Sequence, residues 1–196
     1  MPGLFITFEG PDGSGKSTQV EKLAAALADR SPLVVREPGG TELGERIRDL
    51  LLHRPEGMSA DGEMYLFMAA RAELLATLIK PALAAGRVVI DDRYHDSTMA
   101  YQGGGREIDV PWPASFPKPD LTILLALPPQ DGIGRLVLSG TLLDRLAAES
   151  PDFPRRAAAT YDRHARAAPH GFAPTHPTPA PAPSHHAIME RVMRRL

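Results

Sequence analysis

The spacing of apolar and polar residues divides most of the chain into short strands and amphipathic helices. Between the strand-like runs, apolar residues recur at steps of three and four, which is the spacing of one face of a helix. Pro81 is expected to end or kink the longest of these helices, because proline has no backbone N–H to donate. The predicted strands are residues 4–8, 33–35, 88–90 and 121–127. The predicted helices are residues 20–27, 43–51 and 64–78.

Strands that alternate with helices in this way predict an α/β fold, in which a parallel β-sheet is flanked by helices on both faces. In such a sheet the groups that act on a ligand gather at the carboxyl ends of the strands. At 196 residues and 21.2 kDa the chain is short enough to close around one core. We therefore expect residues 1–196 to form a single domain.

The last third of the chain has a different composition. Six prolines lie between Pro169 and Pro183, separated mainly by Ala, Thr and His. Because proline cannot donate to a strand ladder, a regular central strand is not expected here, and residues 169–183 are predicted to be extended with polyproline character. A helical pattern returns from Ala187 to Leu196.

The turn after the first predicted strand carries a phosphate-binding motif. Residues 10–17 match G-x-x-x-x-G-K-[ST] at every fixed position, between a strand and a helix. The glycines let several backbone N–H groups face phosphate oxygens, and the following helix directs its positive end at the same anion. Lys16 adds a charge for the β- and γ-phosphates, and the Ser17 hydroxyl can bind Mg²⁺. The motif therefore predicts a P-loop NTPase fold.

The residues predicted to bind ATP through this loop are Gly10, Pro11, Asp12, Gly13, Ser14, Gly15, Lys16, Ser17 and Thr18.

Composition and charge narrow the classes of function. A net charge of −2 argues against a protein built to grip nucleic acid, and the absence of cysteine excludes disulfides and thiol catalysis. The chain has no apolar run of about 20 residues and no signal-peptide pattern at its start. We therefore expect a cytoplasmic protein with neither a membrane nor a nucleic acid as its partner. The N-K-x-D tetrapeptide of GTPases is absent, and the chain is short for a helicase or transporter ATPase, so phosphorylation of a small acceptor by ATP is favoured.

Charged residues near the loop offer further ligands for phosphate and metal. Arg93 follows the third predicted strand, where its planar guanidinium can donate two hydrogen bonds to a phosphate. Asp91 or Asp92, at the end of that strand, can hold Mg²⁺ through water. Asp12 lies inside an anion-binding loop, so it is expected to meet a substrate hydroxyl or Mg²⁺. A surface ion pair of Arg93 with Asp92, a helix cap and a loop cap remain open as alternatives.

Phe67 and Arg71 lie four residues apart, which places them on one face of a predicted helix. An aromatic plate and a planar donor in this arrangement can both address one flat base. A core phenylalanine beside a solvated arginine is the alternative interpretation.

Four clusters taken together resemble the thymidylate kinase family. The resemblance runs from about residue 4 to residue 106 and resumes at residues 119–122 and 144–145. As a set these motifs are far more specific than any one of them. They are F-E-G-P-D-G at residues 8–13, R-E-P-G-G-T at 36–41, E-M-Y-L-F-M-A-A-R-A at 63–72 and D-R-Y-H-D-S-T-M-A-Y-Q-G at 92–103.

The resemblance implies transfer of the γ-phosphoryl group of ATP to dTMP, with Mg²⁺ as cofactor and with Lys16, Arg93 and Asp12 in catalysis. Ser17 and Asp92 are the expected metal ligands. A homodimer formed through residues 63–78 is implied as well.

The resemblance also implies roles in the acceptor pocket. Phe67 would stack on the thymine ring, and Tyr101 would crowd the position of a ribose 2′-hydroxyl. A cis bond between Glu37 and Pro38 would shape the pocket. The residues implied to bind dTMP are Glu37, Pro38, Phe67, Arg71, Arg93, Ser97, Thr98, Tyr101 and Gln102.

Departures from the family lie after residue 106. The short lid is expected at residues 131–150, where Arg135 and Arg145 remain as candidates to cover the ATP phosphates. Ser139 stands where the family carries an arginine, and losing such a group can lower the rate by about 10³-fold. The family's fifth strand is replaced by residues 172–177. Two other readings therefore stay open: a kinase for another deoxynucleoside or monophosphate, and a catalytically impaired nucleotide-binding relative.

Overall fold

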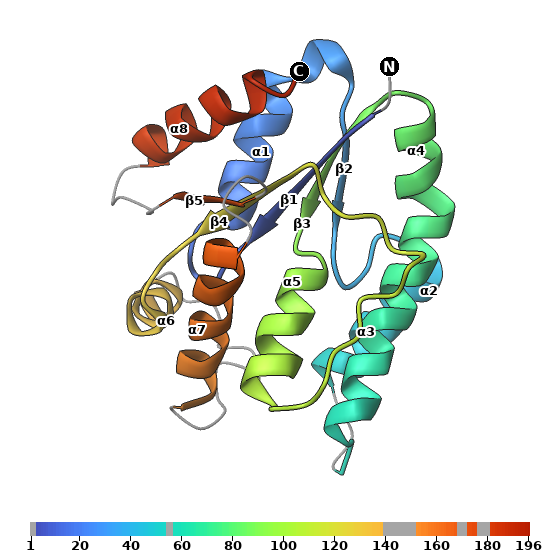
Figure 1. Cartoon of the computed structure of the whole chain (residues 1–196), viewed down its shortest axis with the longest axis vertical. Coiled ribbons are helices and arrows are strands. Elements are labelled where there is room, and N and C mark those ends of the chain that lie inside the picture. The colour runs from blue at the N-terminus through green and yellow to red at the C-terminus, as the bar shows by residue number, and fades with distance from the viewer. Residues whose placement is uncertain (1–2, 54–56, 139–151, 168–171, 176–180) are drawn as a thin grey trace.

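The fold is a five-stranded parallel sheet with the strand order β2-β3-β1-β4-β5 (Figure 1). The computed structural model describes residues 3–53, 57–138, 152–167, 172–175 and 181–196. All four strands expected from the apolar runs are present, and the parallel α/β sheet is confirmed. The strands are β1 Leu4–Glu9, β2 Leu33–Arg36, β3 Val88–Asp92, β4 Leu121–Leu125 and β5 Phe172–Thr175.

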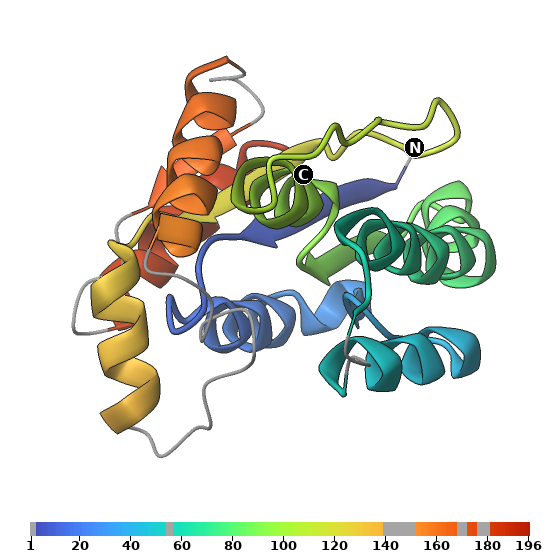
Figure 2. The ribbon, with the colours of Figure 1, turned by 90° about the horizontal axis from the view of Figure 1, so that it is seen from below.

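Helices cover both faces of the sheet, as expected. On one face α1 and α8 pack on the apolar side chains of β1, β3 and β4, and on the other face lie α3, α5 and α7 (Figure 2). The α-helices are α1 Lys16–Ala26, α2 Glu42–Leu52, α3 Ala60–Leu74, α4 Lys80–Ala84, α5 His95–Thr98, α6 Pro129–Leu138, α7 Asp152–Ala167 and α8 Pro181–Met193. The 3₁₀-helical segment is η1 Ala28–Arg30, and the π-helical segments are η2 Leu75–Ile79 and η3 Met99–Gly105.

The long predicted helix is interrupted before Pro81. After α3 the chain widens into the π-helical segment η2 and continues as the short helix α4. Pro81 lies in the first turn of α4, where a missing N–H costs little. The wider turn of η2 accommodates the backbone groups that Pro81 cannot bond, so the long helix does not run on as one regular α-helix.

The prediction that residues 169–183 hold no strand is wrong for Phe172–Thr175. These residues form β5 and pair with β4 in parallel, with Pro174 opposite Leu124. β5 is the edge strand, where a proline can turn its missing donor away from the ladder. The last helix also begins at Pro181 rather than Ala187, because proline is well tolerated in the first turn of a helix.

No helix in the described ranges is long and apolar enough to span a bilayer.

Candidate active site

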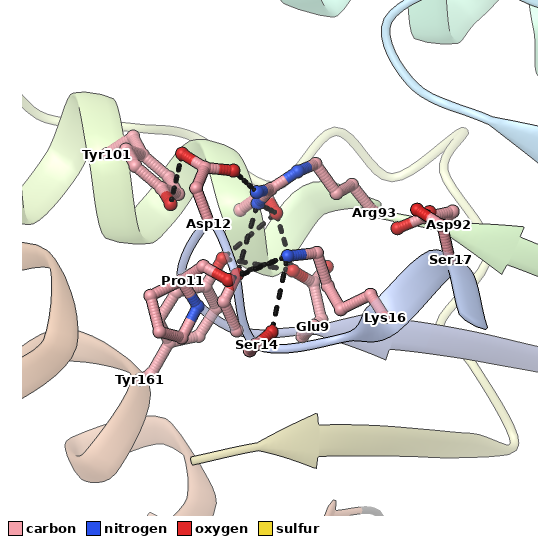
Figure 3. A network of polar contacts seen from close by, with 12 residues as sticks. Glu9, Pro11, Asp12, Ser14, Lys16, Ser17, Asp92, Arg93, Tyr101 and Tyr161 are labelled. Atoms are coloured by element: carbon pink, nitrogen blue, oxygen red, sulfur yellow. Dashed lines mark hydrogen bonds and ion pairs between the residues drawn. The ribbon is translucent and has the colours of Figure 1, made fainter. Parts of the chain in front are cut away.

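The phosphate loop connects β1 to α1 at the carboxyl edge of the sheet. Gly13 and Gly15 have φ angles of 73° and 89°, a region that glycine enters without strain. Lys16 bends back over the loop, and its Nζ donates to the carbonyls of Gly10 and Pro11 at 3.0 and 2.8 Å. The predicted loop is thus folded around the ammonium group of its own lysine (Figure 3).

The environment of Lys16 weakens its hold on a proton. Burial of the side chain, together with the nearby charge of Arg93, lowers the pKa of Lys16 to about 8. Asp12 and Asp92 act in the opposite direction. Figure 3 shows the charged ends of Lys16 and Arg93 converging beside the loop from α1 and from the end of β3. Two cations held this close form a site for an anion.

Ser17 and Asp92 lie together at the mouth of the loop. The Ser17 hydroxyl donates to Asp92 Oδ2 at 2.6 Å, and the serine is exposed. Hydroxyl and carboxylate oxygens are the ligands that Mg²⁺ takes, usually with waters completing its shell. The donor set therefore fits the predicted metal role of these two residues. Asp92 makes no surface ion pair with Arg93, which was the alternative.

Arg93 pairs with Asp12 across the site. Its Nη2 donates to Asp12 Oδ1, its Nη1 donates to the Gly10 carbonyl at 3.2 Å, and the guanidinium lies 5.3 Å from the centre of the Tyr101 ring. Arg93 has a φ of 78°, a left-handed conformation that is uncommon for a residue with a side chain. Although burial opposes ionisation, the charges of Arg93 and Lys16 lower the pKa of Asp12. Asp12 is therefore an ionised partner of Arg93.

Glu9, which sequence reasoning did not select, joins the loop to the acceptor side. Its Oε1 accepts from the Tyr94 N–H at 2.8 Å, and its Oε2 accepts from Ser97 Oγ at 2.5 Å and from the Tyr161 hydroxyl at 3.1 Å. Burial, followed by the charge of Asp96, raises the pKa of Glu9 to about 8. The sequence signal that could have identified Glu9 is a carboxylate at the end of an otherwise apolar strand.

Arg71 is buried rather than solvated. Its side chain is 1% exposed, its Nε donates to Glu37 Oε2 at 2.6 Å, and its Nη1 donates to Thr98 Oγ1 at 3.0 Å. The same Nη1 lies 3.1 Å from His95 Nδ1, which must accept because a guanidinium only donates. Burial and the charge of Arg71 lower the pKa of His95 to about 3, so this imidazole is neutral. The solvated-arginine alternative is wrong.

The remaining acceptor residues lie around this buried cation. Phe67 is half-buried one turn before Arg71 on α3, and the predicted cis bond between Glu37 and Pro38 is present. Gln102, on the π-helical segment η3, donates to Glu63 Oε1 at 2.9 Å. Arg106 pairs with the other Glu63 oxygen at 2.9 Å. Glu63 and Arg106 were not predicted as site residues, because only packing of η3 against α3 brings them together.

The helix α6, at the start of the predicted lid, approaches the phosphate loop closely at Gly132. A Cβ added at Gly132 would lie 2.3 Å from the Asp12 carbonyl oxygen, and one added at Gly13 would lie 2.2 Å from the Gly132 carbonyl oxygen. These distances are far inside van der Waals contact. The approach of α6 to the loop therefore depends on the absence of side chains at both positions. Arg135, which is half-buried, follows one turn later on this helix.

Thr18 is exposed on α1. Arg156 donates to the Gly105 carbonyl at 2.7 Å and so holds α7 to η3. Arg145 and Ser139, with the part of the lid after residue 138, lie outside the described residues.

Comparisons with known proteins agree with these observations. A sequence model of the thymidylate kinase family matches residues 8–173. Thymidylate kinases of Pseudomonas syringae pv. tomato and Leifsonia xyli subsp. xyli are 48% and 47% identical to this chain over 179 and 169 residues, which cover 86% and 82% of this chain and 85% and 80% of theirs. The crystal structure of a thymidylate kinase from Ehrlichia chaffeensis has a TM-score of 0.75 and 29% identity, covering 98% of this chain and 99% of that one.

Proposed function

The chain belongs to the thymidylate kinase family, and on that basis we propose how its side chains carry the γ-phosphoryl group of ATP to dTMP. It is an ATP-binding P-loop kinase that phosphorylates dTMP to dTDP. The observation that carries the proposed site is the convergence of Lys16 and Arg93 beside the phosphate loop, with Ser17 and Asp92 at its mouth.

On the donor side, the ATP phosphates lie against the backbone N–H groups of residues 10–17. Lys16 exchanges its contacts with the loop carbonyls for the β- and γ-phosphates. Ser17 and Asp92 are the residues that would hold Mg²⁺, and the ion would neutralise charge on the phosphate oxygens. Arg135, which follows Gly132 by one turn on the lid helix α6, covers these phosphates from the lid side.

On the acceptor side, Arg93 holds the phosphate of dTMP in line with the donor. The attacking phosphate oxygen is already ionised, so no strong general base is required. Catalysis is then a matter of positioning and of neutralising charge in the transition state, which Lys16 and Arg93 share. Asp12 keeps the Arg93 guanidinium beside the loop and takes the 3′-hydroxyl of the sugar.

The base of dTMP lies against Phe67 and Arg71. Arg71 is held in one orientation by Glu37 and Thr98, which limits the rearrangement needed to meet a base. Ser97 and Gln102 complete the pocket beside them. The Tyr101 hydroxyl lies 3.4 Å from Asp12 Oδ2, where its ring would exclude a ribose 2′-hydroxyl.

The kinase is further proposed to be a cytoplasmic homodimer. Several residues of the implied contact stretch 63–78 are buried by the chain's own core, among them Met64, Met68 and Leu74. The helices α2 and α3, which pack against each other, also carry exposed apolar side chains that the partner copy would cover. These are Leu43 and Leu50 of α2 and Tyr65 of α3, which are 49%, 50% and 63% exposed. A mass measurement by light scattering during gel filtration tests this assembly, and a monomer at micromolar concentration would contradict it.

Release of ADP with different acceptors tests the proposed function. The assay compares dTMP, dUMP, dCMP, dGMP and thymidine at equal concentration with ATP and Mg²⁺. We expect dTMP to give the highest kcat/KM. Faster transfer to thymidine or to another monophosphate would support a kinase for a different acceptor. ATP binding without ADP release from any acceptor would support an impaired nucleotide-binding relative.

A further inference from the structure

The imidazole of His95, at the start of α5, is a buried polar group to which the proposed function gives no role. The residue is fully buried, and its Nδ1 lies 3.1 Å from Nη1 of Arg71. Because a guanidinium only donates, Nδ1 must be the acceptor, and the ring carries its proton on Nε2. Burial, followed by the charge of Arg71, lowers the pKa of His95 to about 3, in agreement with a neutral ring. His95 therefore offers Arg71 a lone pair and no competing charge.

The guanidinium of Arg71 spends most of its donors inside the protein. Its Nε donates to Glu37 Oε2 at 2.6 Å, and its Nη2 donates to the Tyr94 carbonyl at 3.1 Å. Its Nη1 donates to Thr98 Oγ1 at 3.0 Å and to His95 Nδ1 at 3.1 Å. These contacts use four of the five N–H groups of a guanidinium. The fifth N–H, on Nη2, is the one that Arg71 can present to a base.

Aromatic side chains fix the plane of the His95 ring. The Trp112 ring centre lies 4.4 Å from that of His95, with the two planes at 67°, and the Phe116 ring lies at 6.1 Å and 85°. Edge-to-face contacts of this kind are favourable and depend on the angle between the rings. Trp112 is anchored in turn, because its Nε1 donates to the Phe116 carbonyl at 3.2 Å. The His95 ring is therefore held with Nδ1 directed at Arg71.

Arg71 is the main polar partner of this ring. Within the described residues Nε2 of His95 is buried without a partner at full hydrogen-bond geometry, although the Pro111 carbonyl acts on the ring. Burying a polar ring is costly unless it gains a compensating hydrogen bond. The bond that compensates for the burial of His95 is therefore the one to Arg71.

We propose that His95 is a positioning residue for dTMP, whose Nδ1 accepts one N–H of Arg71 Nη1 and so fixes the plane in which the guanidinium meets the base. Without this acceptor, that N–H would face the Met68 sulfur, which lies 3.6 Å from Nη1 and accepts weakly. An unsatisfied buried donor is costly, so the guanidinium would turn away from the orientation that binds the base. The effect on dTMP rests on the proposed function, because it requires that Arg71 addresses the base.

The tautomer of His95 can be measured without any nucleotide. Long-range ¹H–¹⁵N NMR spectra of the wild type at pH 7 should show an unprotonated Nδ1 and a protonated Nε2 for this residue. The signals are assigned by their loss in His95→Phe. A proton on Nδ1, in the opposite tautomer or in a doubly protonated ring, would overturn the proposal, because Nδ1 could then accept nothing from Arg71.

Steady-state kinetics test the positioning role with two variants that separate the ring from the acceptor. His95→Phe keeps an aromatic ring against Trp112 but has no acceptor. It should raise KM for dTMP by about tenfold, as expected when a hydrogen bond from a charged group is lost, and should leave KM for ATP unchanged. His95→Asn loses the ring but keeps an acceptor, since its Oδ1 is bonded to Cγ as Nδ1 is in histidine. It should recover most of the affinity for dTMP.

The ranking of the two variants decides the question. A rise in KM for dTMP that is equal in both, or absent from both, would overturn the proposal. So would a rise confined to His95→Asn, because the ring rather than the acceptor would then carry the effect. Should His95→Phe fail to fold, His95→Leu removes the acceptor with a smaller side chain and takes its place in both measurements.

The matched control is the same substitution at His164. His164 of α7 lies 3.1 Å from Asp96 Oδ1, so it contacts the same short helix α5 next to His95 without touching Arg71. His164→Phe should leave KM for dTMP and for ATP unchanged, and an equal rise there would show that loosening of α5 explains the effect. A wild type that does not use dTMP would contradict the proposed function, and the NMR measurement would still test the contact. A wild type that uses dTMP, beside a His95→Phe variant with unchanged KM, would contradict only the role of His95.

Discussion

The acceptor and donor halves of the site are built in different ways. The acceptor half is a network of buried charged side chains, in which Arg71 pairs with Glu37 and Glu63 pairs with Arg106. The donor half is a glycine-rich loop with exposed positions such as Gly15 and Ser17. At Gly132 the described lid helix approaches the backbone of Asp12 and Gly13 closely. The acceptor half is thus organised before dTMP arrives, whereas the donor half is completed by the phosphates themselves.

The difference follows from what each half binds. A neutral base offers little charge, so recognition depends on side chains already held in one orientation, and buried charges must be paired to remain in the core. A triphosphate is a strong anion, and backbone N–H groups, a helix terminus and Lys16 meet it without a network of side chains. Substitutions in the donor half should therefore change KM for ATP and the turnover number, whereas substitutions in the acceptor half should change KM for dTMP.

Lys16→Ala is expected to have the largest effect. The ammonium group stabilises charge that develops on the transferring phosphoryl group, so turnover should fall by about a thousandfold. Lys16 bonds only within its own loop, and its burial lowers its pKa, so the melting temperature should not fall. Steady-state ADP release measures the turnover number, and a thermal melt measures the melting temperature. Lys22→Ala on the same helix is the control and should leave turnover unchanged. Retained activity in Lys16→Ala would remove the loop from the mechanism.

Phe67→Ala and Arg71→Ala should separate the two substrates most clearly. Both should raise KM for dTMP, Arg71→Ala by about a hundredfold, since a hydrogen bond from a charged group and the orientation of the pocket are lost together. KM for ATP should change little. Removing Arg71 also leaves Glu37 buried without its cation, at a cost of about 3 kcal/mol in the free energy of unfolding. An equal rise in KM for both substrates would show that Phe67 and Arg71 belong to the core rather than to the dTMP pocket.

Gly132→Ala tests the contact between the lid helix and the phosphate loop. The added methyl group would collide with the Asp12 carbonyl, so α6 must move away and KM for ATP should rise by several-fold, with KM for dTMP unchanged. Gly134→Ala is the control, because the same change two residues later meets nothing within 4 Å. Alanine favours a helix over glycine by about 1 kcal/mol, so neither variant should lose helix stability. Identical kinetics of the two variants would show that the contact has no role in ATP binding.

Glu9→Gln addresses the junction of the two halves through the pH dependence of stability. The pKa of Glu9 is raised to about 8 in the folded protein, so the stability it contributes is present below its unfolded value of 4.5 and is lost as the pH rises through 8. The wild-type free energy of unfolding should fall over this interval with a slope of up to about 1.4 kcal/mol per pH unit from this group. Urea titrations from pH 5 to pH 9 should show a smaller fall for Glu9→Gln. Parallel curves for the two proteins would contradict a protonated Glu9.

Several parts of the site were predictable from local sequence. The phosphate loop, the strand before it and the helix after it occupy neighbouring positions in the chain, so their spacing alone defined the loop around Lys16. The resemblance to thymidylate kinases, which the family match confirms, also allowed the cis bond between Glu37 and Pro38 to be predicted. Prediction failed where position in the sheet mattered. The proline in β5 is tolerated only because β5 is an edge strand, which no local pattern reveals.

The sequence by itself determined the α/β order, the phosphate-binding loop and the residue types of the acceptor pocket, because each depends on periodicity or on short fixed spacings. Only the tertiary structure decided that Asp92 meets Ser17 while Asp91 is buried beside Glu37, and that Arg71 is a buried cation. It also decided that Gly132 approaches the phosphate loop. These contacts join segments far apart in the chain, and burial and partner charges, which set the protonation of carboxyl groups, exist only once those segments are packed together.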